Sequence, residues 1–273
     1  MVPKIKNEVE EKNNKGCHVT VTALLSDIDH ARIQFALRFM PEVQLFRYNE
    51  KERAPLHVKL RSDFNPEPYH TDRAVYKQSR VLKKSGSTFN KFMDPMITDA
   101  QRELLAYHID RAFGFDLVPP VVIRPVGKHG SGSLQSWVSC MSGGQWARDY
   151  GYDYKQNTNN PWMHRLAAFD ILIGSVDRHA GNWLMDKEGR VFAIDNGYSF
   201  PKRTCMGGIK CLPLRGLQGV SVSDDTRKII SRIKEEDIFR IMHQYPFRCN
   251  EPFGVCRRLQ YLKGLRVWQP VGR

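Results

Sequence analysis

The sequence predicts an α+β protein built as two lobes, and three observations support this prediction. Residues 17–141 consist mostly of short segments rich in β-branched and aromatic residues, with one strongly helical stretch among them. Residues 161–273 show several helical patterns and one short pair of strands. Between them, residues 142–160 are polar and rich in Gly and Asn, which is typical of a linker. We therefore expect a strand-rich first lobe and a mainly helical second lobe.

The expected first lobe follows a charged segment, residues 1–16, which we predict to be disordered because it is rich in Glu, Lys and Asn. Residues 17–25 alternate and contain β-branched residues, a pattern that predicts a strand. Apolar residues at helical spacing then predict a helix over residues 27–40. Residues 43–48 and 56–62 predict two strands joined by a charged turn.

One helix of the first lobe has clear signals at both ends. Thr98 and Gln101 form a capping-box pattern at the start of residues 98–114, and Gly114 suits the C-terminal cap. This helix is therefore expected to be a fixed element of the lobe. Further strands are predicted on either side of it, over residues 73–79, 117–127 and 134–141.

The expected second lobe begins with residues 161–176, which are apolar on nearly every side and therefore predict a buried helix. Residues 183–186 and 191–195 predict a β-hairpin whose turn reads Lys-Glu-Gly-Arg. Two helices follow at residues 223–233 and 235–245. Each carries acidic residues near its N-terminus, where the helix dipole favours them.

Composition narrows the class of protein. The 273 residues are 41% hydrophobic and 26% charged, as in soluble globular proteins. No apolar run of about 18 residues is present, so no transmembrane helix is predicted, and the N-terminal residues show no signal peptide. The six cysteines form no CxxC pair, which favours a reduced, intracellular protein over a disulfide scaffold or a zinc site. We therefore expect a cytoplasmic location.

The formal net charge of +13 favours an anionic partner such as a nucleotide, an acidic protein or an acidic lipid surface. A basic surface that serves only solubility explains the charge equally well. No stretch alternates Arg or Lys with aromatic residues as a nucleic-acid groove would, so a nucleic-acid partner is not expected. The basic segments 80–87 and 253–268 are the best candidates for contact with an anion.

Five polar side chains stand close together around the predicted hairpin: Asp177, Arg178, His179, Asn182 and Asp195. Phosphoryl transfer needs such a set. One Asp positions or deprotonates the attacking hydroxyl, while an Asn and a second Asp hold Mg²⁺, which prefers hard oxygen ligands. The hairpin would bring Asn182 close to Asp195. We therefore predict the first four residues to be catalytic and Asn182 and Asp195 to be metal ligands. A surface loop and an ordinary Asn-Gly turn are the alternatives.

Two of these side chains have more than one interpretation. Arg178 either orients the loop by pairing with a carboxylate or is simply exposed. His179 either helps proton transfer or stabilises the transferring phosphoryl group, or else it forms a structural hydrogen bond to the backbone of the metal motif. For His179, we favour the structural role.

The segments DRHAGNWLMD (177–186) and VFAIDNGYSFP (191–201) resemble the catalytic loop and the metal motif of the phosphatidylinositol 3/4-kinase-like family. The likeness is greatest to type II phosphatidylinositol 4-kinases and their small microbial and plant relatives, and it covers residues 73–245. This resemblance implies a two-lobed protein-kinase-like fold. It also implies transfer of the γ-phosphoryl group of ATP, with Mg²⁺, to a hydroxyl acceptor.

The resemblance assigns roles in the first lobe as well. RAVYKQS (73–79) is similar to the family's lysine-bearing strand, which makes Lys77 the residue that contacts the phosphates of ATP. Glu103, on the capped helix, would be its partner. Lys59 is the rival lysine, and a solvated side chain is the alternative for either one. Glu103 has the alternative of only balancing the start of its helix.

The adenine-binding hinge is implied at the end of a predicted strand, where backbone groups of Ser139, Cys140 and Met141 would meet the base. The alternative is that this strand is plain core. The sequence departs from many kinases because no Gly-x-Gly-x-x-Gly loop is present to cover the phosphates. The turn over residues 48–55 is the best substitute.

The acceptor is harder to predict. The palmitoylated cysteine cluster of membrane-bound type II lipid kinases is missing and no membrane anchor is visible, so we favour a protein Ser or Thr hydroxyl over an inositol lipid. The expected partners are ATP and either an acceptor protein or an anionic lipid, with transient contact between the basic surface and a membrane. Transfer of AMP, or nucleotide binding without catalysis, are further alternatives.

Overall fold

The computed structural model describes most of the chain: residues 21–40, 42–47, 55–60, 69–81, 93–153, 158–202, 211–247 and 250–270. The predicted disordered tail, residues 1–16, lies outside the described residues. So does nearly all of the charged turn 48–55 that we predicted to replace a glycine-rich loop.

The first lobe contains an antiparallel sheet of five strands in the order β1-β2-β3-β5-β4. The strands are β1 (Glu42–Arg47), β2 (Leu56–Leu60), β3 (Tyr69–Gln78), β4 (Val121–Pro125) and β5 (Ser131–Val138), and a 3₁₀ turn at Gly127–His129 lies between the last two. In β3, Ala74 and Tyr76 point into the apolar core of this lobe. Because side chains alternate along a strand, Lys77 lies on the opposite face.

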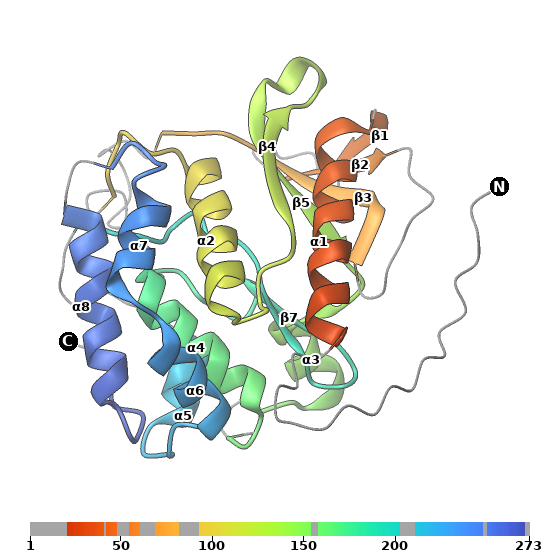
Figure 1. Cartoon of the computed structure of the whole chain (residues 1–273). Helices are drawn as coiled ribbons and strands as arrows, with labels where there is room; N and C mark the ends of the chain where they lie inside the picture. Colours follow the sequence, from red (N-terminus) through yellow and green to blue (C-terminus); the bar gives the residue numbers. More distant parts are fainter. Residues whose placement is uncertain are drawn as a thin grey trace.

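Helix α1 (Val21–Phe39) packs against β3, β4 and β5 and places Ile33 and Leu37 in the core of the sheet (Figure 1). The predicted helix over residues 27–40 is confirmed. The predicted strand over residues 17–25 is wrong for its described part, because residues 21–25 are the first turn of α1. No Gly or Pro separates them from the helix, and extending an existing helix is cheaper than starting a new element.

Helix α2 (Asp99–Phe113) confirms the strongest local prediction. Thr98 accepts a hydrogen bond from the backbone of Gln101, whose side chain accepts one from the backbone of Thr98, so both halves of the capping box form. Gly114 ends the helix with φ 74°, which suits glycine. Buried residues of α2 belong to the same apolar core as the helices of the second lobe, so α2 connects the two lobes.

A small second sheet joins the lobes. It consists of β6 (Met141–Ser142), β7 (Trp183–Met185) and β8 (Val191–Ala193), and it confirms the predicted hairpin. Helix α3 (Gly143–Tyr150) occupies much of the segment expected as a linker. Ser142 and Gln145 form a capping box there, a signal that the polar composition concealed. The division of the chain into domains stays a prediction.

The second lobe is helical and surrounds one buried helix. This central helix is α4 (Pro161–Ile173), and it contacts α5, α6 and α8 (Figure 1). The others are α5 (Leu212–Leu217), α6 (Asp224–Arg232), α7 (Glu235–Met242) and α8 (Asn250–Gly264). The predicted helices at α4, α6 and α7 are confirmed, as is the two-lobed α+β fold. We did not predict α8, because its segment was read only as a basic cluster. Within the described residues, no helix combines the length and apolarity needed to span a bilayer.

Candidate active site

Lys77 of β3 lies between two carboxylates. Its Nζ is 2.9 Å from Oε1 of Glu103 on α2 and 2.9 Å from Oδ1 of Asp195, which follows β8. The sequence analysis predicted Glu103 as the partner of Lys77 and, separately, Asp195 as a metal ligand, and the structure brings all three together. Lys59, the rival lysine, is exposed on β2 and takes no part in this cluster.

The pKa values of Lys77 and Asp195 are shifted in opposite directions. Burial opposes the charged form of Lys77, but Asp195 and Glu103 outweigh that effect and raise the pKa of the lysine above its ordinary value. The pKa of Asp195 is lowered, chiefly by the charge of Lys77 and against the effect of burial. Arg178 and His179 lower the pKa of Asp195 further. Lys77 and Asp195 are therefore both charged near neutral pH, which suits a site for phosphates and a metal ion.

The β7–β8 hairpin brings Asn182 and Asp195 to the same end of the small sheet. Trp183 pairs with Ala193, and the backbone N–H of Ile194 donates to the carbonyl of Asn182 at 3.1 Å. Asp195 then leaves the strand with φ 57°, a left-handed conformation that is uncommon outside glycine. Such strain is maintained only where the surroundings fix the backbone, and it turns the carboxylate toward Lys77.

The catalytic loop is closed by its own hydrogen bonds. The carbonyl of Asp177 accepts from the backbone of His179 at 2.9 Å and from Nδ2 of Asn182 at 2.9 Å. Val176 donates to the carbonyl of Tyr198 at 3.1 Å, which ties the loop to the segment after Asp195. Since the amide nitrogen of Asn182 is held by Asp177, its Oδ1 is the atom placed to accept a cation.

Arg178 forms the rigid base of this loop. The guanidinium is buried and paired with the buried Asp170 of α4, with Nε 3.1 Å from both carboxylate oxygens. It also donates to the carbonyls of Asn182 and Ile194 and to Oδ1 of Asn196. Of the two interpretations, pairing with a carboxylate is therefore confirmed, and an exposed side chain is wrong.

His179 differs from the favoured prediction. Its side chain is exposed, and Nδ1 accepts a hydrogen bond from the backbone of Gly181 at 3.0 Å, so its described bond lies within its own loop rather than with the metal motif. A histidine two residues before a glycine can fold back locally in this way, which a sequence pattern does not reveal. The ring remains next to Asp195, whose pKa it lowers.

Sequence reasoning missed two residues that hold the site. Arg102, beside Glu103 on α2, is buried and donates to the carbonyls of Ser199 at 2.7 Å and Phe200 at 2.9 Å. It thereby fixes the chain that follows the metal motif. Asp170 is the other, and its signal was available, because a lone acid in the apolar helix Ala-Ala-Phe-Asp-Ile-Leu-Ile needs a buried partner. Arg102 carried no comparable signal.

The predicted hinge lies where the chain passes from the large sheet to the small one. Ser139 is exposed, Cys140 and Met141 are half-buried, and the backbone of Cys140 donates to Val138 at 2.9 Å. Met141 then pairs with Met185 in β7. The segment therefore connects the two lobes at the position that a hinge requires, while its contact with adenine stays a prediction.

The donor atoms suit Mg²⁺ bound together with phosphates. Asp195 contributes a half-exposed carboxylate and Asn182 an amide oxygen, both of which are hard ligands. Within the described residues, no group of three or more His, Cys, Asp or Glu side chains is arranged to hold a metal alone. Mg²⁺ commonly takes one or two protein ligands and completes its shell with substrate phosphates and water. Bound there, the ion would supply neutralisation of phosphate charge.

Fold and site together define a two-lobed protein-kinase-like protein. Residues 160–261 match the family model described as phosphatidylinositol 3- and 4-kinase. This segment begins just before α4 and contains the catalytic loop, Asp195 and most of α8. The match thus falls on the second lobe, which carries the most specific motifs.

Comparison with individual proteins agrees. Protein Rv2133c of Mycobacterium tuberculosis is 30% identical over 130 residues, which cover 37% of this chain and 46% of that protein. Phosphatidylinositol 4-kinase gamma 3 of Arabidopsis thaliana is 31% identical over 135 residues, or 38% of this chain and 22% of the plant protein. These matches and the family model support a PI3/PI4-kinase-like family for this chain. The matched region spans less than half of either relative.

One solved structure is similar in outline. A Helicobacter pylori proinflammatory kinase, CtkA, aligns with a TM-score of 0.47 and 14% identity, covering 84% of this chain and 93% of that one.

Proposed function

We propose that the protein transfers the γ-phosphoryl group of ATP, with Mg²⁺, to a hydroxyl acceptor. The observation that carries this proposal is the placement of Lys77 between Glu103 and Asp195, next to the loop that bears Asp177 and Asn182. In this proposal Lys77 binds the ATP phosphates and Glu103 holds the lysine in position. Asn182 and Asp195 hold Mg²⁺.

Asp177 is the proposed group that positions or deprotonates the acceptor hydroxyl. Its backbone carbonyl is fixed by His179 and Asn182, so its partly exposed side chain is presented from a closed loop. Arg178 is a positioning residue in this scheme, because its guanidinium is buried and contacts the loop rather than the substrate. His179 is exposed and near Asp195, and we propose that it stabilises the charge of the transferring phosphoryl group only weakly.

The acceptor belongs to one of two classes. A protein Ser or Thr hydroxyl is the class that the sequence favoured. An inositol lipid is the second candidate, and the observation that favours it is the similarity to a plant protein named as a phosphatidylinositol 4-kinase. The segment after the metal motif would be expected to contact the acceptor, but residues 203–210 lie outside the described part of the chain.

The test is transfer of label from γ-³²P-ATP with Mg²⁺ to acidic and basic protein substrates and, in parallel, to phosphatidylinositol vesicles. Asp195→Asn should abolish labelling, whereas the matched control Asp186→Asn, in the turn of the same hairpin, should retain it. Label on protein or on lipid identifies the acceptor class. Label from α-³²P-ATP on the acceptor would instead indicate AMP transfer. ATP binding without any labelling would indicate a nucleotide-binding module and overturn the proposal.

A further inference from the structure

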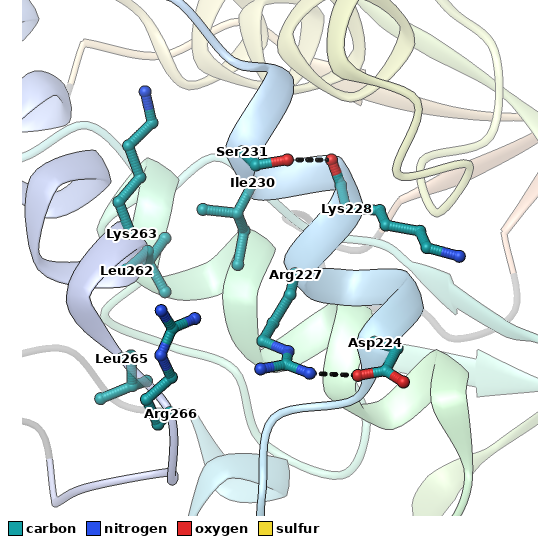
Figure 2. Close-up of a pocket in the computed structure, with 9 residues that line it drawn as sticks. All are labelled: Asp224, Arg227, Lys228, Ile230, Ser231, Leu262, Lys263, Leu265 and Arg266. Carbon is teal, nitrogen blue, oxygen red and sulfur yellow. Dashed lines mark hydrogen bonds and ion pairs between the residues drawn. The ribbon is translucent and has the colours of Figure 1, made fainter.

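A concave site lies in the helical lobe, apart from Lys77 and its partners. It has a volume of about 500 Å³ and is formed by α6 together with the C-terminal end of α8 and the residues that follow. The residues that line it are Asp224, Arg227, Lys228, Ile230, Ser231, Leu262, Lys263, Leu265 and Arg266 (Figure 2). None of them belongs to the candidate active site. We name this hollow the α6–α8 pocket.

Positive charge dominates the α6–α8 pocket. Four of its lining residues are basic and one, Asp224, is acidic. Asp224 pairs with Arg227, which also lines the pocket, and the pKa of Asp224 is lowered chiefly by that arginine. No ion pair is found for Arg266 within the described residues. Like charges held together without enough acids repel one another, so an anion that enters between them is stabilised.

Two arginines face the hollow. Figure 2 shows the side chains of Arg227, from α6, and Arg266, from the segment after α8, in the space between the two helices, with Ile230 and Leu262 at its apolar wall. The ammonium end of Lys228 extends away from the hollow, and Nζ of Lys263 donates to the carbonyl of Ile233, at the end of α6, at 2.8 Å. Guanidinium groups bind phosphate oxygens through paired N–H donors, which a single ammonium cannot do.

The backbone around the arginines is fixed. The carbonyl of Arg266 accepts from the backbone of Val222 at 2.9 Å. Trp268 donates to the carbonyl of Val220 at 2.9 Å and accepts from the backbone of Gly219 at 3.0 Å. Ser221 and Val267 form an antiparallel bridge. These bonds join the residues after α8 to those that lead into α6, so the two arginines are held on a common frame. A preorganised charge pair loses less entropy on binding than flexible surface side chains do.

We propose that the α6–α8 pocket binds a phosphate-bearing anion, with Arg227 and Arg266 as the phosphate contacts. The size of the hollow suits a small phosphorylated molecule, and the apolar wall accommodates its ring or chain. The same chemistry is offered by a soluble inositol phosphate and by the head group of an anionic phospholipid. This inference does not depend on the proposed activity, because no residue of the pocket is shared with it.

The test is titration calorimetry of the full chain with inositol hexakisphosphate at physiological salt. Replacing both arginines, Arg227→Gln with Arg266→Gln, should weaken binding by at least about tenfold, since each loses a charge-assisted hydrogen bond. The matched control is Arg232→Gln, an exposed arginine on the same helix that does not line the pocket. The control and Lys77→Met should both bind as the unmodified protein does, and thermal melts should confirm that all variants are folded.

Vesicle co-sedimentation separates the two sources of the phosphate. Phosphatidylcholine vesicles with and without phosphatidylinositol 4-phosphate are compared for the same proteins. Binding to vesicles but not to the soluble phosphate, lost in the double variant, supports a lipid head group as the ligand. If the double variant and the Arg232→Gln control bind equally well, binding depends on the overall charge of the protein and not on the pocket, and the proposal is overturned. So would the absence of binding to both probes.

Discussion

Two ion clusters belong to the candidate site, and they differ in how far solvent reaches them. Arg178 and Asp170 are both 0% exposed, and the remaining donors of the arginine are taken by nearby acceptors. Lys77 is 21% exposed and its partner Asp195 is 46% exposed. The first cluster has its ligands inside the protein. The second cluster keeps part of its charge available to a ligand. In this protein the buried Arg178–Asp170 pair therefore supports the structure of the loop, whereas the partly exposed Lys77–Asp195 pair is suited to binding a ligand.

We expect the largest effect on stability from breaking the buried Arg178–Asp170 cluster. Arg178→Met should lower the free energy of unfolding by about 3–5 kcal/mol, because it leaves the carboxylate of Asp170 buried without a cation. Chemical denaturation measures this change. The double variant Arg178→Met with Asp170→Leu removes both charges and should recover part of the loss. If the single variant unfolds at the same denaturant concentration as the unmodified protein, the guanidinium does not support the loop.

A third buried acid, for which no ion pair is found among the described residues, sharpens the comparison. Burial raises the pKa of Asp110 on α2 to about 7, although the backbone of Leu117 donates to it at 2.9 Å. The folded state therefore holds a proton that the unfolded chain has released, so stability should fall as the pH rises from about 4 to about 7 and then level off. The loss attributable to this group is at most about 4 kcal/mol.

Asp110→Asn should flatten that decline, since the amide does not titrate. Unfolding curves at a series of pH values test the expectation, with Asp149→Asn, exposed on α3, as the control that should keep the slope. An unchanged slope in the Asp110 variant would assign the pH dependence to other groups.

Changes to the partly exposed cluster of Lys77, Glu103 and Asp195 should affect activity more than stability. Lys77→Met removes the proposed phosphate contact and should lower kcat/KM for ATP by about 100-fold, as does the loss of one preorganised donor in other enzymes. Its unfolding free energy should fall by less than that of Arg178→Met. Asp195 is half-exposed and regains water, so only Glu103, which is 5% exposed, loses its cation, whereas Arg178→Met also leaves three further acceptors without their donor. Lys59→Met is the matched control on the same sheet. A variant whose stability falls as far as that of Arg178→Met would remove the distinction between the two clusters.

The smallest effect is expected at His179. The exposed ring bonds only within its own loop among the contacts described, so His179→Ala should change kcat by no more than about threefold, well below the effect of a positioned general acid or base. Steady-state rates across a pH range decide the point. A loss of 100-fold or more would make the histidine a catalytic residue after all.

The sequence predicts those elements whose structure depends on residues close together along the chain. The capping box of α2, the buried α4 and the β7–β8 hairpin all have local signals, and the hairpin alone places Asn182 near Asp195. The position of Lys77 followed from family resemblance rather than from its strand pattern, which fits Lys59 equally well. Residues whose partners are remote in sequence were missed. Arg102 reads as an ordinary helix surface residue, and only the folded chain shows that it is buried.

The neighbouring residues Arg102 and Glu103 give α2 a mechanical consequence. Glu103 pairs with Lys77 in the strand-rich lobe, while Arg102 holds the carbonyls of Ser199 and Phe200 in the helical lobe. A turn or shift of α2 would pull on both connections at once. A displacement of α2 would therefore break the Lys77–Glu103 ion pair and the hydrogen bonds from Arg102 to Ser199 and Phe200 together. The position of this one helix thus affects the lysine of the first lobe and the segment after Asp195 at the same time.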